Sequence, residues 1–371
     1  MTARADRLLL VLPSLERGGG EHVLLELARA FVAAGREVHV AALLGGGPLR
    51  NQVPSGVTLH ELIGTDYVAK GFGLAWRAFP KLVLLVRTLR PDAVLSTITG
   101  TNLLTVLACM RARAGSRVVL REASSLVNAR SVLKRAAMRW LYRRVDAVVA
   151  VSTGVAEDLR RLGIPDGCIH VIHNPVDCQR LRRLAEIGPS FPEATKAPYI
   201  IALGRLTEAK DYPSLLQAYA SSKLRWTHRL VIVGGGELLD HLHDLARELG
   251  VADHVLLAGE IGNPFRVLAG AALLVLSSRW EGYPNVLLEA LALGVPVVAT
   301  DCPHGPREIL DDGRYGHLVP LGDAEALAAA MDVEFQRPVP CRFDVLLGFH
   351  NPRIIASNYL GLLDGVGVKT A

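Results

Sequence analysis

Cysteine is scarce in this sequence and is not arranged in pairs. The 371 residues include five cysteines, an odd number, and no two of them form a Cys-x-x-Cys motif. This spacing predicts neither a disulfide framework nor a structural zinc site. Such cysteine use is typical of a protein in a reducing cytosol.

Long apolar runs are missing as well. The first apolar stretch, "LLLVLP" at residues 8–13, is too short for the core of a signal peptide and is followed by glycines instead of a cleavage site. No stretch reaches the roughly 18 consecutive apolar residues of a membrane-spanning helix. We therefore expect a cytoplasmic protein that does not cross a membrane.

A third absence concerns nicotinamide cofactors. In "IVGGGELLDHL", which begins with the end of a predicted strand, Leu239 occupies the position of the third glycine in a G-x-G-x-x-G fingerprint. This departure argues against a dinucleotide-dependent oxidoreductase.

Positive charge, by contrast, is abundant in one half of the chain. The formal net charge is +5, but residues 1–190 hold 26 Lys+Arg against 15 Asp+Glu, a net of +11, and the remainder holds 15 against 21, a net of −6. The asymmetry indicates that the first half meets an anionic surface or partner.

Short apolar runs alternate with amphipathic stretches along most of the chain, which is typical of α/β proteins with parallel sheets. The rhythm stops where Pro189, Pro192 and Pro198 punctuate a polar stretch. We predict two doubly wound domains, at 1–180 and 199–345, joined by a linker at 181–198. A tail helix at 351–364 is expected to pack back on the first domain, and no role is predicted for residues 333–350.

Two glutamates, Glu281 and Glu289, stand eight positions apart in "SSRWEGYPNVLLEALALGVPVVAT" at residues 277–300. A buried strand precedes this stretch, and Gly294 is placed to end a helix. Glu281 is therefore expected in a strand-to-helix loop, where open α/β sheets bind ligands, and Glu289 in the second turn of the helix.

The predicted helix start should attract an anion, because it offers the backbone N–H groups of Gly282, Tyr283 and Asn285. Carboxylates beside an anion site suit the hydroxyls that flank the diphosphate of a nucleotide-sugar. The alternative is that Glu281 caps the helix and Glu289 is a solvated surface residue.

Cations and glycines follow other predicted strands. Arg205 and Lys210 lie just after a strand, and this pair can neutralise a diphosphate, unless both are ordinary surface cations. Gly18, Gly19 and Gly20 separate the first strand from the first helix, where glycine lets the backbone approach phosphate closely.

The motifs "GRLTEAKD", "EGYPNVLLEALALGVPVVATDCPHGPREIL", "YGHLVPLGD" and "SLERGGGEHVLLELARAFVAAGREVHV", together with "VIHNPVD" at the junction, resemble the retaining glycosyltransferases of family 4. The resemblance covers nearly the whole chain to about Asp323. It implies the GT-B fold, in which two Rossmann-like domains face a cleft.

The resemblance also implies roles for single residues. Arg205 and Lys210 match the positions that hold the donor diphosphate, Glu289 the carboxylate that binds the ribose, and Glu281 the one that faces the donor sugar. The remaining donor-binding positions are Gly18, Gly19 and Gly20, which would close over the diphosphate, the base-binding segment Gly259, Glu260, Ile261 and Gly262, and Gly282, Tyr283, Pro284 and Asn285.

One position departs from the family pattern. Many members carry a histidine near the donor sugar where this sequence reads "VVLREASSL", with Arg121 and Glu122. The two are assigned an acceptor-side role, with an ordinary ion pair as the alternative.

The mechanism expected from these residues needs no metal or cofactor. Arg205, Lys210 and the helix N-terminus stabilise the leaving diphosphate, while Glu281 stabilises the positive ring. The chain also contains no Asp-x-Asp motif. Retention of anomeric configuration is implied by the resemblance alone.

Residues 129–146, "ARSVLKRAAMRWLYRRVD", predict a basic amphipathic helix of the kind that lies on anionic bilayers, and "WRAFPKLVLLVRTLRP" at 76–91 is a second candidate. Either stretch could instead pack its apolar face on the sheet. We expect a nucleotide-sugar donor, which the resemblance implies is a UDP-sugar, and a lipid-linked saccharide acceptor in bacterial surface polysaccharide or lipopolysaccharide assembly. Peripheral contact with the inner face of the cell membrane is expected, and no nucleic acid.

Two rival functions share part of this pattern. A non-transferring GT-B enzyme, such as a UDP-sugar 2-epimerase, would keep the fold and the nucleotide site but needs no basic membrane face. A protein that only binds would have no use for Glu281 and Glu289.

Overall fold

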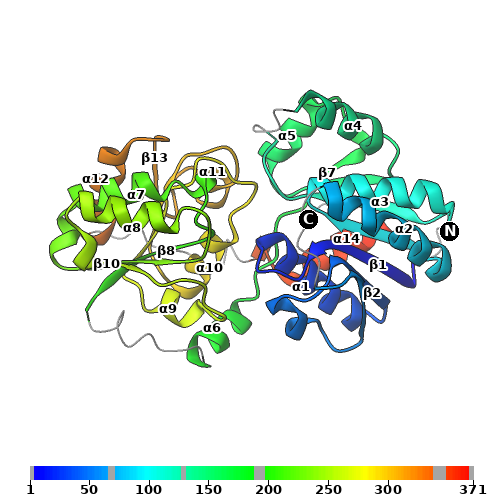
Figure 1. Cartoon of the computed structure of the whole chain (residues 1–371), viewed down its shortest axis with the longest axis horizontal. Coiled ribbons are helices and arrows are strands. Elements are labelled where there is room, and N and C mark those ends of the chain that lie inside the picture. Colours follow the sequence, from blue (N-terminus) through cyan, green and yellow to red (C-terminus); the bar gives the residue numbers. More distant parts are fainter. Residues whose placement is uncertain (1–3, 66–71, 127–130, 188–196, 337–347, 367–371) are drawn as a thin grey trace. The chain divides into compact units, whose positions relative to one another are not determined.

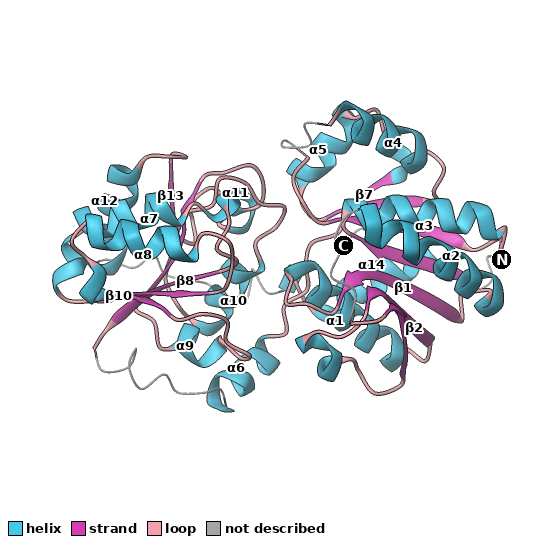
Figure 2. Cartoon of the chain, in the orientation of Figure 1, coloured by secondary structure: helices cyan, strands magenta, loops and turns pink. Residues whose placement is uncertain are grey.

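The computed structural model of the chain describes residues 4–65, 72–126, 131–187, 197–336 and 348–366. By its contacts the chain divides into two compact units: unit 1 comprises residues 1–175 and 349–371, and unit 2 comprises residues 176–348. Each unit contains one parallel sheet flanked by helices (Figures 1 and 2).

Unit 1 is built on a seven-stranded sheet in the order β3-β2-β1-β4-β5-β6-β7. Its strands are β1 (Arg7–Ser14), β2 (Glu37–Leu44), β3 (Val57–Ile63), β4 (Ala93–Thr97), β5 (Arg117–Glu122), β6 (Ala147–Ala150) and β7 (Ile169–Val171). Its helices are α1 (Gly19–Ala33), α2 (Phe72–Leu89), α3 (Thr99–Ala112), α4 (Val132–Tyr142), α5 (Thr153–Arg161) and α14 (Pro352–Leu363).

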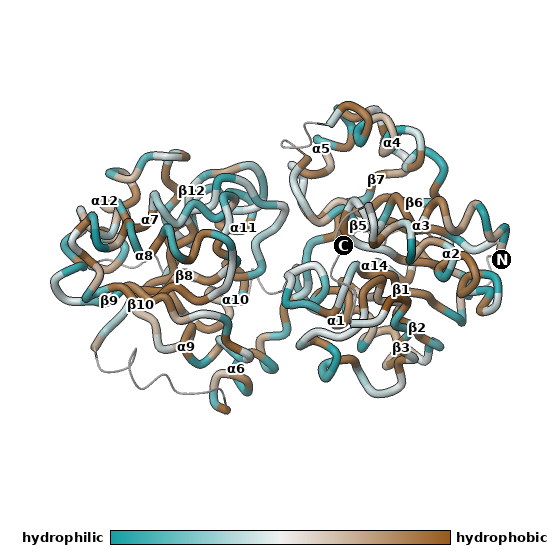
Figure 3. Tube along the Cα trace, viewed as in Figure 1, coloured by the Kyte–Doolittle hydropathy of each residue, from teal (hydrophilic) through white to brown (hydrophobic). Residues whose placement is uncertain are grey.

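Both faces of this sheet are buried. Along β1, Leu8, Leu10 and Leu12 join the core formed with α1 and α14, whereas Leu9 and Val11 join the core formed with α2 and α3. Successive side chains of a strand point to opposite faces, so a strand covered on both sides is apolar throughout. Accordingly, the central strands of both units, such as β1 and β8, run through strongly hydrophobic parts of the chain trace (Figure 3).

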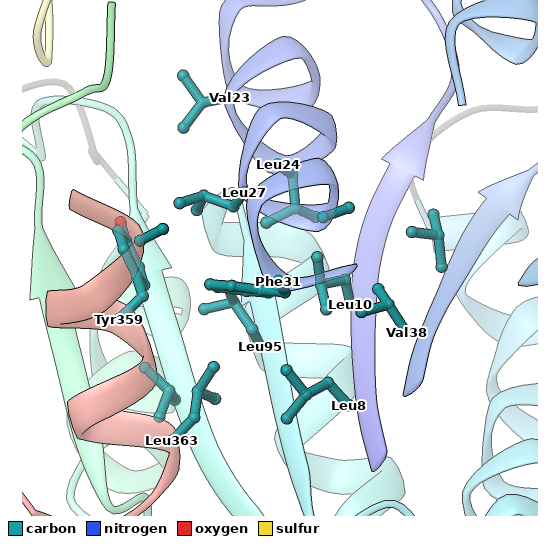
Figure 4. Close-up of a cluster of buried hydrophobic side chains, with 14 of the residues drawn as sticks. Leu8, Leu10, Val23, Leu24, Leu27, Phe31, Val38, Leu95, Tyr359 and Leu363 are labelled. Carbon is teal, nitrogen blue, oxygen red and sulfur yellow. The ribbon is translucent and has the colours of Figure 1, made fainter. Parts of the chain in front are cut away.

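The tail helix α14 completes the core of unit 1. Tyr359 and Leu363 are 0% and 2% exposed and lie in the same cluster as Phe31 of α1 and Leu95 of β4 (Figure 4). Asp364, which follows the helix, accepts from Arg36 Nη2 at 2.7 Å. Residues far apart in the sequence therefore share one core.

Unit 2 has a six-stranded parallel sheet in the order β10-β9-β8-β11-β12-β13. Its strands are β8 (Tyr199–Leu203), β9 (Arg229–Val233), β10 (Val255–Leu257), β11 (Leu273–Leu276), β12 (Val297–Thr300) and β13 (His317–Val319). Its helices are α6 (Cys178–Ile187), α7 (Tyr212–Ser221), α8 (Leu239–Glu248), α9 (Phe265–Ala269), α10 (Asn285–Leu293), α11 (Pro306–Ile309) and α12 (Ala324–Gln336). The prediction of two doubly wound parallel sheets is confirmed.

The boundary between the units differs from the predicted one. The stretch 181–198 is not a linker throughout, because α6 occupies residues 178–187. Leu181 is buried, and the carbonyl oxygen of Leu184 accepts from Asn263 Nδ2 at 2.8 Å, so α6 is fastened to unit 2. Residues 188–196 of the expected linker and residues 337–347, where the second domain was predicted to end, lie outside the described residues.

Candidate active site

Unit 2 has a topological switch point between β8 and β11. The chain winds one way from β8 through β9 to β10 and the other way from β11 through β12 to β13. Loops that follow the strands on the two sides of such a point diverge and leave a crevice for a ligand. Arg205 and Lys210 follow β8, and Glu281 follows β11, so these predicted site residues lie at the switch point.

Lys210 and Glu281 form an ion pair across this point. Lys210 Nζ lies 2.5 Å from Glu281 Oε1, and the two side chains are 20% and 13% exposed. The same carboxylate oxygen accepts from Ser278 Oγ at 2.7 Å. Two donors thus hold Glu281 through one carboxylate oxygen, and Glu281 is not a helix cap, because α10 begins four residues later.

Arg205 is a cationic residue of the site whose guanidinium group is not engaged by other described residues. Its side chain is exposed and makes no hydrogen bond or ion pair with any residue that the structure describes. The backbone of its loop is nevertheless fixed, since Leu206 N donates to Gly235 O at 2.8 Å. An exposed guanidinium on a fixed loop can bind an anionic group with a fork of donors.

Glycine is required where the loops after β8 and β9 touch. Gly234 has φ +149°, and a Cβ at this position would overlap the carbonyl oxygen of Gly204. The N–H of Gly234 also donates to Gly259 O at 2.8 Å, which links the loop after β10. The glycines of "IVGGGE" therefore permit three neighbouring loops to pack at one edge of the sheet.

The base-binding segment predicted at Gly259–Gly262 follows β10 at this same edge. Gly259 has φ +68°, Ile261 is buried, and Glu260 and Gly262 are exposed. Its place two strands from β8 leaves room for an extended ligand along the strand ends.

Glu289 lies in the second turn of α10, which ends at Gly294 in the left-handed conformation, as predicted. Burial raises the pKa of Glu289 to about 7, although the nearby Lys210 ammonium lowers it. Gly282, Tyr283 and Pro284 precede the helix, and all three are buried. A Cβ at Gly305 would lie 2.6 Å from Pro284 Cδ, so the turn before α11 packs directly on this helix start.

Gly18, Gly19 and Gly20 belong to unit 1, where they lead from β1 into α1. They lie at the switch point of that sheet, between β1 and β4. A Cβ at Gly18 would overlap the carboxylate of the buried Glu21, so a side chain there would displace it. That these glycines bind the diphosphate stays a prediction.

Arg121 and Glu122 end β5, with 1% and 0% exposure. Arg121 donates to Thr97 Oγ1 at 2.9 Å and to Asn174 Oδ1 at 2.5 Å. Glu122 instead accepts from Thr99 Oγ1 at 2.9 Å and from the Tyr142 hydroxyl at 2.7 Å. Adjacent strand residues point to opposite faces, so among the described residues no ion pair joins the two.

The acceptor-side role of Arg121 and Glu122 stays a prediction. The structure adds a structural role for Arg121 inside unit 1. Asn174 and His350 stand near the two places where the chain passes between the units, and His350 Nδ1 donates to the carbonyl oxygen of Asn174 at 3.0 Å. Arg121 at the end of β5 binds Asn174, and Asn174 in turn accepts from His350. Arg121 is therefore connected to both segments of unit 1 that lead to or from unit 2.

Within the basic stretch at 129–146, residues 132–142 form α4, and residues 129 and 130 lie outside the described residues. Its apolar residues divide between two faces: Met138, Leu141 and Tyr142 are buried in unit 1, whereas Leu133 and Trp140 are 83% and 48% exposed. Basic side chains on α4 and just after it are all exposed, namely Lys134, Arg135 and Arg139 on the helix and Arg143 and Arg144 after its end. The second candidate helix, α2, exposes Trp76 and Leu84.

Sequence reasoning did not identify the buried hydroxyls around Glu281. Ser277 donates to Lys210 O at 2.8 Å, and Thr300 Oγ1 donates to Ser278 O at 2.6 Å. The available signal was the pair of serines directly after a buried strand, because polar groups buried there need partners.

Two family models match the chain in succession. Residues 17–180 match the model described as Glycosyltransferase Family 4, and residues 185–333 match the model described as Glycosyl transferases group 1. The fold is similar to that of HepE from Anabaena in complex with UDP and glucose, with a TM-score of 0.81 and 18% identity over 96% of this chain and 99% of that one.

Curated relatives agree with this classification. A transferase of Campylobacter jejuni, N-acetylgalactosamine-N,N'-diacetylbacillosaminyl-diphospho-undecaprenol 4-alpha-N-acetylgalactosaminyltransferase, is 29% identical over 87% of this chain and 88% of its own length. The lipopolysaccharide core biosynthesis glycosyltransferase LpsE of Rhizobium meliloti is 35% identical over 52% of this chain and 54% of its own length. The chain therefore belongs to the glycosyltransferases of family 4 with the GT-B fold.

Proposed function

We propose that this glycosyltransferase moves a hexose or an N-acetylhexosamine from a UDP-sugar to a lipid-linked saccharide, with retention of anomeric configuration, in the assembly of a bacterial surface polysaccharide or lipopolysaccharide. The observation that carries the proposal is the convergence of Arg205, Lys210 and Glu281 at the switch point of unit 2. Two cations and a carboxylate lie after the carboxyl ends of two neighbouring strands, β8 and β11. They match the negative and positive charges that separate when a glycosyl phosphate bond breaks.

The charges assign a task to each side chain. Negative charge grows on the leaving diphosphate, where Arg205 and Lys210 supply cationic hydrogen-bond donors. Positive charge grows on the sugar ring, which the carboxylate of Glu281 stabilises. Glu289 accepts hydrogen bonds from the ribose hydroxyls. In this scheme the protein's own cations neutralise the diphosphate, and no metal ion takes part.

Donor and acceptor classes are supported by the relatives. The name of the C. jejuni transferase describes an undecaprenol-diphosphate-linked acceptor, and another HepE structure holds UDP-glucose. A polyprenyl-linked saccharide stays in a bilayer, so an enzyme that uses one must work at the membrane surface. The exposed cations of α4, with Leu133 and Trp140 between them, fit an anionic bilayer. Among the residues that the structure describes, no helix is long and apolar enough to cross a bilayer.

The decisive assay measures release of nucleoside diphosphate from UDP-, GDP- and ADP-sugars, with EDTA, in the presence or absence of a bacterial polyprenyl-lipid extract. We expect lipid-dependent release from a UDP-sugar that survives EDTA and is lost in Glu281→Ala. Conversion of the donor without release would instead identify the epimerase, and an unaffected variant would contradict the role of Glu281. The anomeric proton of the product, followed by NMR, tests retention.

Membrane contact is tested separately with vesicles. The wild-type protein should sediment with vesicles containing phosphatidylglycerol and less with phosphatidylcholine vesicles, and salt should weaken the association. A Leu133→Gln, Trp140→Gln double variant removes two of the exposed apolar side chains of α4 and should reduce sedimentation. The matched control is a Leu321→Gln, Val333→Gln double variant in unit 2, whose two side chains are 47% and 49% exposed. Equal sedimentation of the double variant and the wild type would contradict docking through α4.

A further inference from the structure

Three buried hydroxyl groups, of Ser277, Ser278 and Thr300, form hydrogen bonds next to the candidate site; this set is called the brace. Ser277, Ser278 and Thr300 are 3%, 0% and 3% exposed. Ser277 bonds the backbone of Lys210, Ser278 bonds the side chain of Glu281, and Thr300 bonds the backbone of Ser278. Buried hydroxyls without partners are costly, so this set fixes the loops after β8 and β11 in one arrangement.

Within the brace, the two oxygens of Glu281 are not equivalent. Oε1 accepts both the Ser278 hydroxyl at 2.7 Å and the Lys210 ammonium at 2.5 Å. Oε2 accepts no hydrogen bond from any residue in the described part of the chain. The protein therefore occupies one oxygen and leaves the other available.

Lys210 alone could not hold Glu281 in this way. A lysine ammonium is a rotatable donor on a flexible stem, and in the proposed function it also serves the diphosphate. The hydroxyl of Ser278 is short, neutral and buried, and the carbonyl group of the same residue is fixed by Thr300. Its hydrogen bond can hold the carboxylate when the ammonium is shared with a phosphate.

We propose that Ser278 is a positioning residue for glycosyl transfer: it fixes Glu281 so that Oε1 is held by the protein and Oε2 faces the donor sugar. This inference rests on the proposed role of Glu281. It adds a residue that touches no substrate and acts only through the orientation of the carboxylate.

The test compares Ser278→Ala with the wild type in turnover of UDP-N-acetylgalactosamine, UDP-galactose and UDP-glucose, and in binding of UDP. Misplacing a reacting group by about 1 Å can cost roughly 100-fold in rate, so we expect kcat to fall about 10- to 100-fold. The Kd of UDP, which has no sugar at this position, should change less than about twofold. Equal losses in kcat and in UDP affinity would show general damage to the site and would overturn the proposal.

Two further variants separate positioning from packing. Ser222→Ala removes a buried hydroxyl bond, to Asp332, elsewhere in unit 2, so we expect a lower melting temperature and kcat within about threefold of the wild type. Ser278→Cys keeps a weak donor of similar size, and its kcat should lie between those of Ser278→Ala and the wild type. A kcat of Ser222→Ala as low as that of Ser278→Ala would overturn the proposal.

Glu281→Gln distinguishes this inference from the proposed function. An inactive Glu281→Gln beside a fully active Ser278→Ala would overturn the role of Ser278 alone. A fully active Glu281→Gln would overturn both, because Ser278 acts through that carboxylate. If Glu281→Gln retains measurable residual turnover, adding Ser278→Ala should cost nothing further.

Discussion

The two glutamates that stand eight positions apart have different surroundings. Glu281 lies in a loop and is held by Lys210 and Ser278. Glu289 lies on a helix, where burial raises its pKa to about 7. A group with this pKa changes charge near neutral pH, so the affinity of the site should depend on pH through Glu289.

The affinity for UDP should rise as the pH increases through about 7. Ribose hydroxyls donate to the ionised carboxylate, so binding lowers the pKa of Glu289, and by linkage binding is stronger once the group is ionised. Each unit by which ribose lowers this pKa strengthens binding above the transition about tenfold relative to binding below it. Isothermal titration calorimetry between pH 6 and 8 measures the effect.

Glu289→Gln is the control for this titration. The phosphates of UDP also change charge near pH 6, and they do so with either protein. Only the difference between the two proteins reports on Glu289. Identical pH profiles for both proteins would contradict the role of this carboxylate.

At the scale of elements, the sequence predicted strands and their following loops better than side-chain networks. Arg205 and Glu281 could be placed because apolar runs locate strands and parallel strand ends share one edge of the sheet. Helix α6 was missed because prolines downstream of it dominated the interpretation of residues 181–198, although Leu181 and Leu184 have helical spacing.

The buried network around Glu122 was not predictable in the same way. Its partners Thr99 and Tyr142 come from separate helices, and no local spacing joins them. The contact between Ser278 and Glu281 was closer in sequence, but its meaning depends on Lys210, which is brought there by a different strand. Pairings across elements become visible only once the topology is known.

Gly234→Ala should disturb the loop that carries Arg205. An alanine at this position needs a positive φ and would also clash with the carbonyl oxygen of Gly204. We expect a loss of roughly 2 to 5 kcal/mol in stability, from strain and overpacking together, and weaker binding of UDP. Thermal unfolding and UDP calorimetry measure the two effects.

Gly250→Ala provides the matched control in the same unit. Gly250 has φ +67°, but a Cβ there meets nothing within 4 Å. It should cost about 1 to 2 kcal/mol through backbone strain and leave UDP affinity unchanged. Equal effects of the two alanines on UDP affinity would show that the contact between the loops does not matter.

At the scale of the whole molecule, unit 1 depends on the last described helix. Leu363→Ala removes a side chain that is 2% exposed in the core shared by α1 and α14, and should cost roughly 2 to 5 kcal/mol. Ile354→Ala, on the same helix but 46% exposed, should cost less than about 1 kcal/mol. Differential scanning calorimetry compares the two variants.

UDP identifies which thermal transition belongs to which unit. A ligand stabilises the part of a protein that binds it, so under the proposed function UDP should raise the transition of unit 2. Leu363→Ala should lower the other transition. A shift of the UDP-sensitive transition alone would contradict a role of α14 in the core of unit 1.

The return of α14 to unit 1 has a consequence for the order in which the protein matures on the ribosome. Synthesis runs from the N-terminal to the C-terminal end, so all of residues 176–348 exist before Tyr359 and Leu363 can enter the core of unit 1. The buried core cluster of unit 2 consists of residues between 200 and 331. Unit 2 can therefore fold before α14 has been synthesised and has joined unit 1. The part that is translated first is therefore completed last, and its exposed sheet face must be protected from aggregation during synthesis.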